Sequence, residues 1–307
     1  MSTKIAVRDL GRWYGQVVGL NDLTLEIGEG ITGLIGPNGA GKSTFLKLIA
    51  GEIRPSRGSL RVLGEEPFAN QNLFARLGFC PQQDALYERM TGLEFVSFLV
   101  RLSGFSRADA KRLAGRALER VALQDAAHRK TKTYSKGMRQ RVRLAQAIAH
   151  EPELLIVDEP LTGLDPIARE SLTTLFKELA SEGTSILLSS HVLHEVESMT
   201  REIVLLHRGR LLAQGEVREV RDLLSRHPRR IEFEARSPRL LAGALMELEV
   251  VSSIQIAPDT SRLLVETSDA GGFFRALTPV VAEGDFGVTS MECADEDLES
   301  VFDYLVG

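Results

Sequence analysis

Eight residues near the N-terminus have the types and spacing of a loop that binds phosphate. The sequence Gly-Pro-Asn-Gly-Ala-Gly-Lys-Ser fits the pattern in which a lysine and a hydroxyl end a glycine-rich turn. Glycines let the backbone N–H groups point inward, and the helix that follows adds partial positive charge at its N-terminus. A strand over 31–35 and a helix over 42–50 are expected on either side. The pattern predicts a nucleoside triphosphate site, with candidate ATP-binding residues Gly36, Pro37, Asn38, Gly39, Ala40, Gly41, Lys42 and Ser43.

Two carboxylates follow the aliphatic run 154–157. Such a run suits a buried parallel strand, and ligands of open α/β sheets bind where the strands end. Asp158 would hold Mg²⁺ through water, and Glu159 would orient or deprotonate the water that attacks the γ-phosphate. An acidic cap or turn is the alternative, because Pro160 ends the strand. Downstream of a phosphate loop, the catalytic interpretation is favoured.

Two more polar residues follow apolar segments that suit strands. His191 comes after the expected strand 185–188 and two serines, where a third parallel strand would deliver it near the γ-phosphate. Gln82 follows the apolar stretch 77–81, and its amide could contact both Mg²⁺ and water. Gln83 is an alternative that the spacing leaves open.

A fourth motif, Tyr-Ser-Lys-Gly-Met, precedes an expected helix over 136–150. Ser135 can cap this helix, and Gly137 permits close approach of a backbone. The apolar residues of the segment recur at helical spacing, so one face suits burial.

Together, the motifs resemble those of the nucleotide-binding subunits of ATP-binding-cassette (ABC) transporters, over about residues 4–220. The resemblance makes 36–43 the Walker A loop, and it implies ATP and Mg²⁺ as ligands. The metal would be held by Ser43, Gln82 and Asp158. The resemblance also implies that Tyr14, next to Trp13, stacks on adenine, and that Thr44, just behind the loop, helps to bind ATP. The other motifs it assigns are Gln82 in the Q-loop, Asp158 and Glu159 in Walker B, Gly163-Leu164-Asp165 as the D-loop, and His191 as the switch histidine. A buried core aromatic is the alternative for Tyr14 and Trp13.

The family's signature motif is Leu-Ser-Gly-Gly-Gln, and Tyr134 to Met138 departs from it at three positions. In the family, this serine and helix N-terminus bind the γ-phosphate of ATP held by a second cassette. The resemblance therefore assigns ATP contacts in trans to Ser135, Lys136, Gly137 and Met138. Lys136 replaces a glycine, so it either adds charge at that phosphate or points into solvent. The Tyr start and Lys-Gly-Met core resemble the exporter branch that moves drugs, polymers, lipids or metal-linked cargo.

Composition agrees with a protein of this kind. The chain has 307 residues, 43% of them hydrophobic, which suffices for a large core and permits a second domain. We find no apolar run of eighteen residues and no apolar N-terminal region of the secretory type. Two distant cysteines, Cys80 and Cys293, suggest a reducing compartment without a disulfide framework. The net charge of −5 argues against nucleic acid as the main partner.

A change in charge indicates two domains. From Leu240 to the end there are 13 acidic and 2 basic residues, and the basic segment Arg226 to Arg230 precedes this region. We therefore expect an ATP-binding domain over 1–225 and an accessory domain over 226–307. The basic segment suits a solvated linker, with anionic lipid as an alternative contact. The acidic surface suits dimerisation, regulation or partner binding as well as plain solvation.

The expected fold is α/β, that of an ABC-type P-loop NTPase. A β subdomain is expected over 4–30, a RecA-like core over 31–84 and 150–220, and a helical subdomain over 85–149 with helices at 91–103, 106–122 and 136–150. The accessory domain is expected to be a small α+β domain of ferredoxin-like βαββαβ order. Its predicted elements are strand 231–236, helix 238–248, strands 250–256 and 261–267, helix 271–283, strand 286–292 and helix 295–305.

The predicted function is that of an ATPase that converts ATP and water to ADP and phosphate and couples this reaction to transport, with export as the direction. Two copies would act on a separate integral membrane permease at the cytoplasmic face of the cell membrane. One alternative is a soluble ABC-type ATPase that acts on nucleic acid or ribosomes. A P-loop kinase is another, but it would leave the Ser135 motif and His191 without roles.

Overall fold

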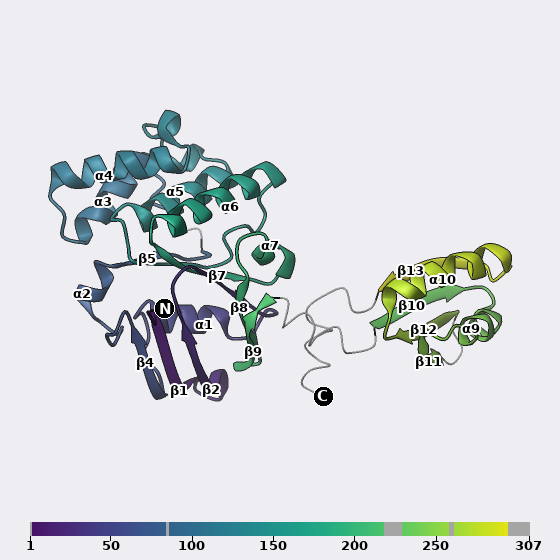
Figure 1. Ribbon diagram of the computed structural model, residues 1–307. Helices are drawn as coiled ribbons and strands as arrows, with labels where there is room; N and C mark the ends of the chain where they lie inside the picture. The colour runs from purple at the N-terminus through teal and green to yellow at the C-terminus, as the bar shows by residue number, and fades with distance from the viewer. Residues whose placement is uncertain (1, 84–85, 218–228, 258–260, 294–307) are drawn as a thin grey trace. The chain divides into compact units, whose positions relative to one another are not determined.

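The computed structural model divides the chain into two compact units, Met1–Glu216 and Val217–Gly307. Figure 1 shows their helices and strands. The structure describes every residue except 1, 84–85, 218–228, 258–260 and 294–307. The expected domain boundary between 225 and 226 and the expected last helix, 295–305, lie outside the described residues.

A mostly parallel sheet carries the loops of unit 1 that were predicted to do chemistry. Its strand order is β5-β6-β7-β3-β8-β9, and only β9 runs antiparallel to its neighbour. The strands are β3 (Ile31–Ile35), β5 (Leu77–Cys80), β6 (Leu154–Val157), β7 (Ser185–Ser190), β8 (Glu202–His207) and β9 (Arg210–Glu216). Every residue of β6 and β7 is buried, as expected for central strands of a parallel sheet.

A second sheet is antiparallel, in the order β2-β1-β4. It consists of β1 (Ile5–Tyr14), β2 (Val17–Ile27) and β4 (Arg57–Val62). The sequence prediction placed β4 in the α/β core, and this was wrong. Buried Leu60 and Val62 alternate with exposed neighbours, a pattern typical of a sheet with one solvated face.

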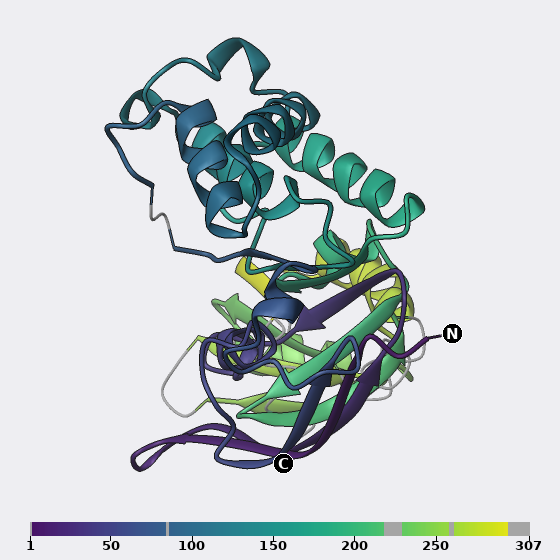
Figure 2. The same ribbon diagram turned by 90° about the vertical axis from the view of Figure 1, so that its left-hand side faces the viewer.

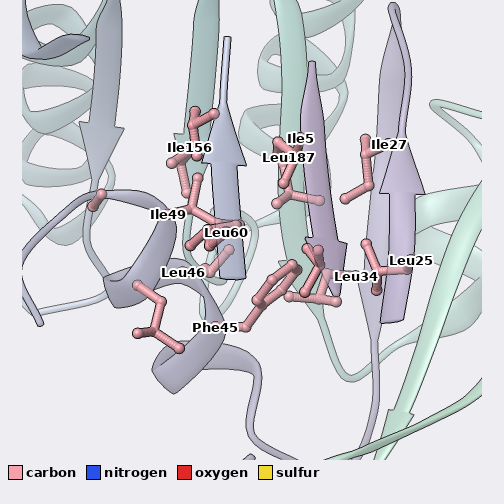
Figure 3. Close-up of a cluster of buried hydrophobic side chains, with 14 of the residues drawn as sticks. Ile5, Leu25, Ile27, Leu34, Phe45, Leu46, Ile49, Leu60, Ile156 and Leu187 are labelled. Atoms are coloured by element: carbon pink, nitrogen blue, oxygen red, sulfur yellow. The ribbon is translucent and has the colours of Figure 1, made fainter. Parts of the chain in front are cut away.

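Helix α1 (Lys42–Ile49) packs between the two sheets. Figure 3 shows its buried side chains Phe45, Leu46 and Ile49 within this cluster. The antiparallel sheet contributes residues such as Ile5, Leu25 and Leu60, and the parallel sheet contributes Leu34, Ile156 and Leu187. Packing from both sides fixes the helix that leaves the phosphate loop.

The helices α3, α4 and α5 gather at one end of unit 1, away from β1, β2 and β4 (Figure 2). Their N-caps are Thr91, Ser106 and Ser135, each of which accepts a hydrogen bond from a backbone N–H of the first turn. The helices of unit 1 beyond α1 are α2 (Gln71–Phe74), α3 (Gly92–Leu102), α4 (Arg107–Arg120), α5 (Lys136–Ile148), α6 (Pro166–Ser181) and α7 (Leu193–Glu197). Among the described helices, none combines the length and apolarity needed to cross a bilayer.

Unit 2 has the βαββαβ order that the sequence predicted. Its elements are β10 (Arg229–Ala235), α9 (Pro238–Met246), β11 (Val251–Ile256), β12 (Arg262–Thr267), α10 (Ala270–Glu283) and β13 (Val288–Cys293). They form an antiparallel sheet in the order β11-β12-β10-β13, with both helices packed on one face. The other face carries ion pairs such as Arg230–Glu266 at 2.8 Å, so it is polar.

We expect Phe233→Ala to destabilise unit 2 without destabilising unit 1. Phe233 is fully buried, with its ring centroid 6.3 Å from that of Phe273, so truncation should cost about 3–5 kcal/mol. Trp13 is the chain's single tryptophan and lies in β1, so its fluorescence reports on unit 1 alone. As urea is added, circular dichroism should show unit 2 unfolding at a lower urea concentration than in the unmodified chain, while tryptophan fluorescence, which reports on unit 1, should not change there. The matched control is Phe274→Ala, at a site 36% exposed; coincident shifts of both signals would show that the units unfold together.

Candidate nucleotide site

A pocket of about 290 Å³ opens over the phosphate loop. The predicted residues that line it include Tyr14, Gln82 and Glu159, which come from three separate segments. The full lining is Tyr14, Val17, Val18, Gly19, Pro37, Asn38, Gly39, Ala40, Gly41, Lys42, Ser43, Thr44, Gln82 and Glu159. Sequence reasoning missed Val17 and Val18, which are 68% and 48% exposed. The available signal in the sequence was their position, three and four residues after the candidate adenine-stacking Tyr14.

Two glycines of the loop are required for different reasons. Gly41 has φ +103° at the N-cap of α1, a conformation that side chains disfavour. Gly36 is absent from the pocket lining, and a Cβ there would collide with the carbonyl of Leu206. Gly36 therefore lets the loop pack closely on β8, and its carbonyl accepts a hydrogen bond from Lys42.

The Lys42 ammonium lies at the base of the pocket and is only 6% exposed. Its Nζ donates to the carbonyls of Gly36 at 2.6 Å and Pro37 at 3.1 Å, and it lies 3.6 Å from Glu159 Oε1. Burial lowers the pKa of Lys42, and the Glu159 carboxylate acts in the opposite direction. A charged group with these partners can exchange them for the oxygens of a phosphate.

Ser189 of β7 bridges the Asp158 carboxylate and the backbone of Glu159. Its Oγ donates to Asp158 Oδ1 at 2.6 Å and accepts from the Glu159 backbone N–H at 2.9 Å. Glu159 has φ +51°, a strained conformation for a residue with a side chain, and such strain is common at functional sites. Ser189 is the first of the two serines that precede His191 in the sequence, and no role was predicted for it.

His191 lies against the expected catalytic carboxylate. Its Nδ1 is 2.9 Å from Glu159 Oε2, which also accepts from Thr162 Oγ1 at 3.0 Å. Strand β7 extends through Ser190, two residues further than predicted, so His191 follows the strand directly. The geometry brings the lysine, the glutamate and the histidine into one chain of contacts.

Of the two candidate Q-loop glutamines, Gln82 lines the pocket and Gln83 does not. The carbonyls of both residues accept from Arg143 of α5. Asp158, the other predicted metal-binding carboxylate, is buried at the end of β6.

The signature residues lie outside the pocket of their own chain. Ser135 is exposed and accepts from the Met138 N–H at 3.3 Å, while the pocket lining contains none of 135–138. Lys136 does not simply extend into solvent, because its ammonium lies over Gly163, where a Cβ would collide with it. This lysine therefore packs against the segment predicted to be the D-loop.

Arg169 connects the predicted D-loop to α7, the helix that follows His191, and sequence reasoning missed it. Asp165 caps α6 by accepting from Ala168 N at 2.8 Å. Arg169 donates to the carbonyl of Leu164 at 3.0 Å and to Glu195 Oε1 at 2.8 Å. Glu195 is 8% exposed, so this ion pair is shielded on the carboxylate side.

We expect Tyr14→Ala to raise the KM for ATP about tenfold with a smaller effect on kcat, because base–aromatic stacking contributes about 1–3 kcal/mol. Tyr14 lies at the pocket, 43% exposed, with the Arg12 guanidinium 4.8 Å from its ring centroid. Trp13, the neighbouring aromatic, is not part of the lining. Steady-state hydrolysis over a range of ATP concentrations measures the effect, with Tyr14→Phe as the control that keeps the ring. An unchanged KM in Tyr14→Ala would mean that adenine binds elsewhere.

Comparisons with known proteins match both the fold and the motifs. The family model described as ABC transporter matches residues 20–162. An uncharacterized ABC transporter ATP-binding protein of Bacillus subtilis is 33% identical over 97% of this chain and 98% of its own length. The bacitracin transport ATP-binding protein of Enterococcus faecalis is 32% identical over 100% of this chain and 97% of its own. The daunorubicin/doxorubicin resistance ATP-binding protein of Streptomyces peucetius is 31% identical over 99% and 92%.

Solved structures agree. The structure of an ATP-binding subunit of an ABC transporter is 33% identical to this chain, with a TM-score of 0.65 over 72% of this chain and 93% of its own. A dimeric bacterial ABC transporter cassette, 24% identical, has the same fold with a TM-score of 0.64 over 69% and 98%.

Proposed function

Because this chain belongs to the ATP-binding proteins of ABC transporters, it is an ATPase that drives transport, and we propose that it acts as one of two identical copies bound to a membrane permease. The family predicted from the motifs is thereby confirmed. The observation that carries the proposed mechanism is the contact chain Lys42–Glu159–His191 below the phosphate loop. It places a cation for phosphate and a carboxylate for water in one pocket.

A second copy supplies what the pocket lacks. The signature residues 135–138 are not part of their own chain's pocket, although Ser135 lies exposed at the N-terminus of α5, where an anion is stabilised. In a head-to-tail pair, Ser135 and Gly137 of each copy reach the γ-phosphate in the other copy's site. The dimeric cassette with the same fold supports this arrangement. ATP closes the pair, and hydrolysis reopens it.

Hydrolysis requires a water molecule in line with the γ-phosphorus. Glu159 orients this water and accepts its proton while the bond from the γ-phosphorus to the bridging oxygen breaks, leaving ADP and phosphate. His191 holds Glu159 through the 2.9 Å contact to Oε2. Lys42 exchanges its carbonyl partners for β- and γ-phosphate oxygens and stabilises their charge.

The predicted metal-binding residues suit Mg²⁺. Ser43 and Gln82 bring a hydroxyl and an amide oxygen to the pocket, and Asp158 contributes a buried carboxylate that Ser189 orients. Oxygen donors of this kind are those that Mg²⁺ prefers. The ion would supply neutralisation of charge on the β- and γ-phosphates.

The permease and the direction of transport are inferred from relatives. Named relatives include proteins of bacitracin transport, of daunorubicin/doxorubicin resistance and of Nod factor export. A cassette with the same fold is described as part of a larger ABC transporter complex. We therefore place this chain at the cytoplasmic face of the membrane, where it drives export while the permease selects the cargo.

The test is to purify the tagged chain from native membranes in mild detergent and to assay ATP hydrolysis on the same fraction. We expect a polytopic membrane protein to co-purify and to raise ATP turnover. The Glu159→Gln variant should recover the same protein without turnover. Recovery of only soluble proteins or nucleic acid, with turnover unaffected by membranes, would favour a soluble ABC ATPase. Transfer of phosphate to a small acceptor would favour a kinase.

A further inference from the structure

Strand β5 forms an edge of the parallel sheet and leads directly into the Q-loop. On its inner side, the carbonyls of Arg76 and Cys80 accept hydrogen bonds from Leu154 N and Asp158 N, at the start and the end of β6. Alternate carbonyls of a strand point to opposite sides. The outer carbonyls therefore need partners from elsewhere in the fold.

Side chains from one face of α5 and the residues just after it supply those partners. They are spaced three and four residues apart, so they lie in a row along the helix. The contacts are His150 Nε2 to Leu77 O at 3.0 Å, Gln146 Nε2 to Phe79 O at 2.8 Å, and Arg143 Nη1 to Pro81 O at 2.9 Å. The row holds the signature helix in register with the edge strand.

Arg143 does more than continue this row. Its Nη1 also lies 2.7 Å from the carbonyl of Gln82 and 2.8 Å from that of Gln83. Three consecutive carbonyls thus converge on one nitrogen of a permanently charged group. Its Nη2 donates to Gln140 Oε1, which orients the guanidinium. Arg143 therefore fixes the backbone of Gln82, whose side chain reaches the nucleotide pocket.

The same helix begins at the signature serine. Ser135 caps α5 eight positions before Arg143, a distance of about 12 Å along a helix. A helix transmits displacement as a rigid body over this length. Movement of Gln82 is thus linked through one side chain to the position of Ser135.

We propose that Arg143 is a positioning residue that couples the Q-loop to the signature helix. Nucleotide at Gln82 shifts the Q-loop carbonyls, and Arg143 carries α5 with them, so that Ser135 is presented to the second copy only when its own site is filled. This proposal rests on the two-copy site of the proposed function. Gln146 and His150 anchor α5 to β5 without contacting the Q-loop glutamines through any described hydrogen bond.

That difference provides the matched control. Arg143→Met and Gln146→Met each remove one donor of the row and keep a side chain of similar length, and both are made in the Glu159→Gln background. ATP is titrated while dimer formation is followed by light scattering, and ATP affinity is measured separately on dilute monomer. We expect Arg143→Met to raise the ATP concentration for half-maximal dimer about tenfold, with monomer affinity unchanged. Gln146→Met should shift this concentration less than about twofold, and Arg143→Lys should shift it by an amount between those of the two methionine variants.

Identical dimer-formation curves for Arg143→Met and Gln146→Met would overturn the proposal, because they would show that Arg143, like Gln146, only attaches α5 to β5. A parallel loss of monomer affinity would also overturn it. If the Glu159→Gln parent itself fails to dimerise with ATP, the proposed two-copy function is wrong, and the role of Arg143 is tested separately. Steady-state ATP hydrolysis is then compared between Arg143→Met and Gln146→Met, both with Glu159 intact. A kcat about tenfold lower in Arg143→Met at constant KM supports coupling, and equal kcat values in the two variants refute it.

Discussion

Glu159→Gln is expected to lower ATP turnover by about 10²–10⁴-fold while ATP stays bound, because general base catalysis contributes a factor of this size. The Glu159 side chain is 7% exposed, and its carboxylate contacts both Lys42 and His191. Glutamine keeps its shape and its capacity to accept hydrogen bonds, but it cannot take the proton of water. Phosphate release and retained nucleotide, measured on the same sample, separate chemistry from binding.

Glu170→Gln is the control for Glu159→Gln, since this glutamate is exposed in α6. It should hydrolyse ATP like the unmodified chain. Turnover at the unmodified rate in Glu159→Gln would remove the role assigned to this carboxylate. Loss of turnover together with loss of bound ATP would instead indicate a damaged pocket.

Lys42→Ala is expected to weaken ATP binding about a hundredfold or more, because hydrogen bonds to charged groups contribute about 1.5–3 kcal/mol each. It should also destabilise the nucleotide-free protein by about 3 kcal/mol, since it leaves a buried carboxylate without its ammonium. Both side chains of the Lys42–Glu159 pair are 7% exposed. Nucleotide titration and urea denaturation followed by Trp13 fluorescence measure the two effects.

The control for Lys42→Ala is Lys47→Ala, which removes an exposed lysine from the same helix. Adding Glu159→Gln to Lys42→Ala should restore stability but not ATP binding, because the unpaired charge is then gone. Unchanged stability in Lys42→Ala would mean that the ion pair is not formed in the nucleotide-free protein.

Local pattern was sufficient to predict the elements that carry the site. Strand β6 was predicted at its observed bounds because four aliphatic residues in a row, ended by Pro160, suit a short strand buried on both faces. Helix α5 was predicted to start at Lys136 because Ser135 is a strong N-cap. In unit 2, the predicted order of strands and helices, βαββαβ, is the order that the structure shows.

Long-range pairing and side-chain reach were not predictable in this way. The pairing of β4 with β1 depends on a partner about fifty residues away, and local pattern gives no information on partners. Arg143 donates to carbonyls about sixty residues before it, and nothing near it distinguishes it from Arg139 or Arg141. Ser189 bridges Asp158 and Glu159 only because β6 and β7 are neighbours in the sheet.

The central claim is that two copies complete each nucleotide site, and the mass of the complex that Glu159→Gln forms with ATP tests it most directly. We expect twice the chain's 33.8 kDa with ATP and a single copy without it. In the same background, Ser135→Asn should still dimerise. Ser135→Asp should not, because aspartate keeps the helix cap but sets a negative charge against the γ-phosphate. A single copy that retains ATP, or a Ser135→Asp variant that dimerises as well as Ser135→Asn, would contradict the two-copy site.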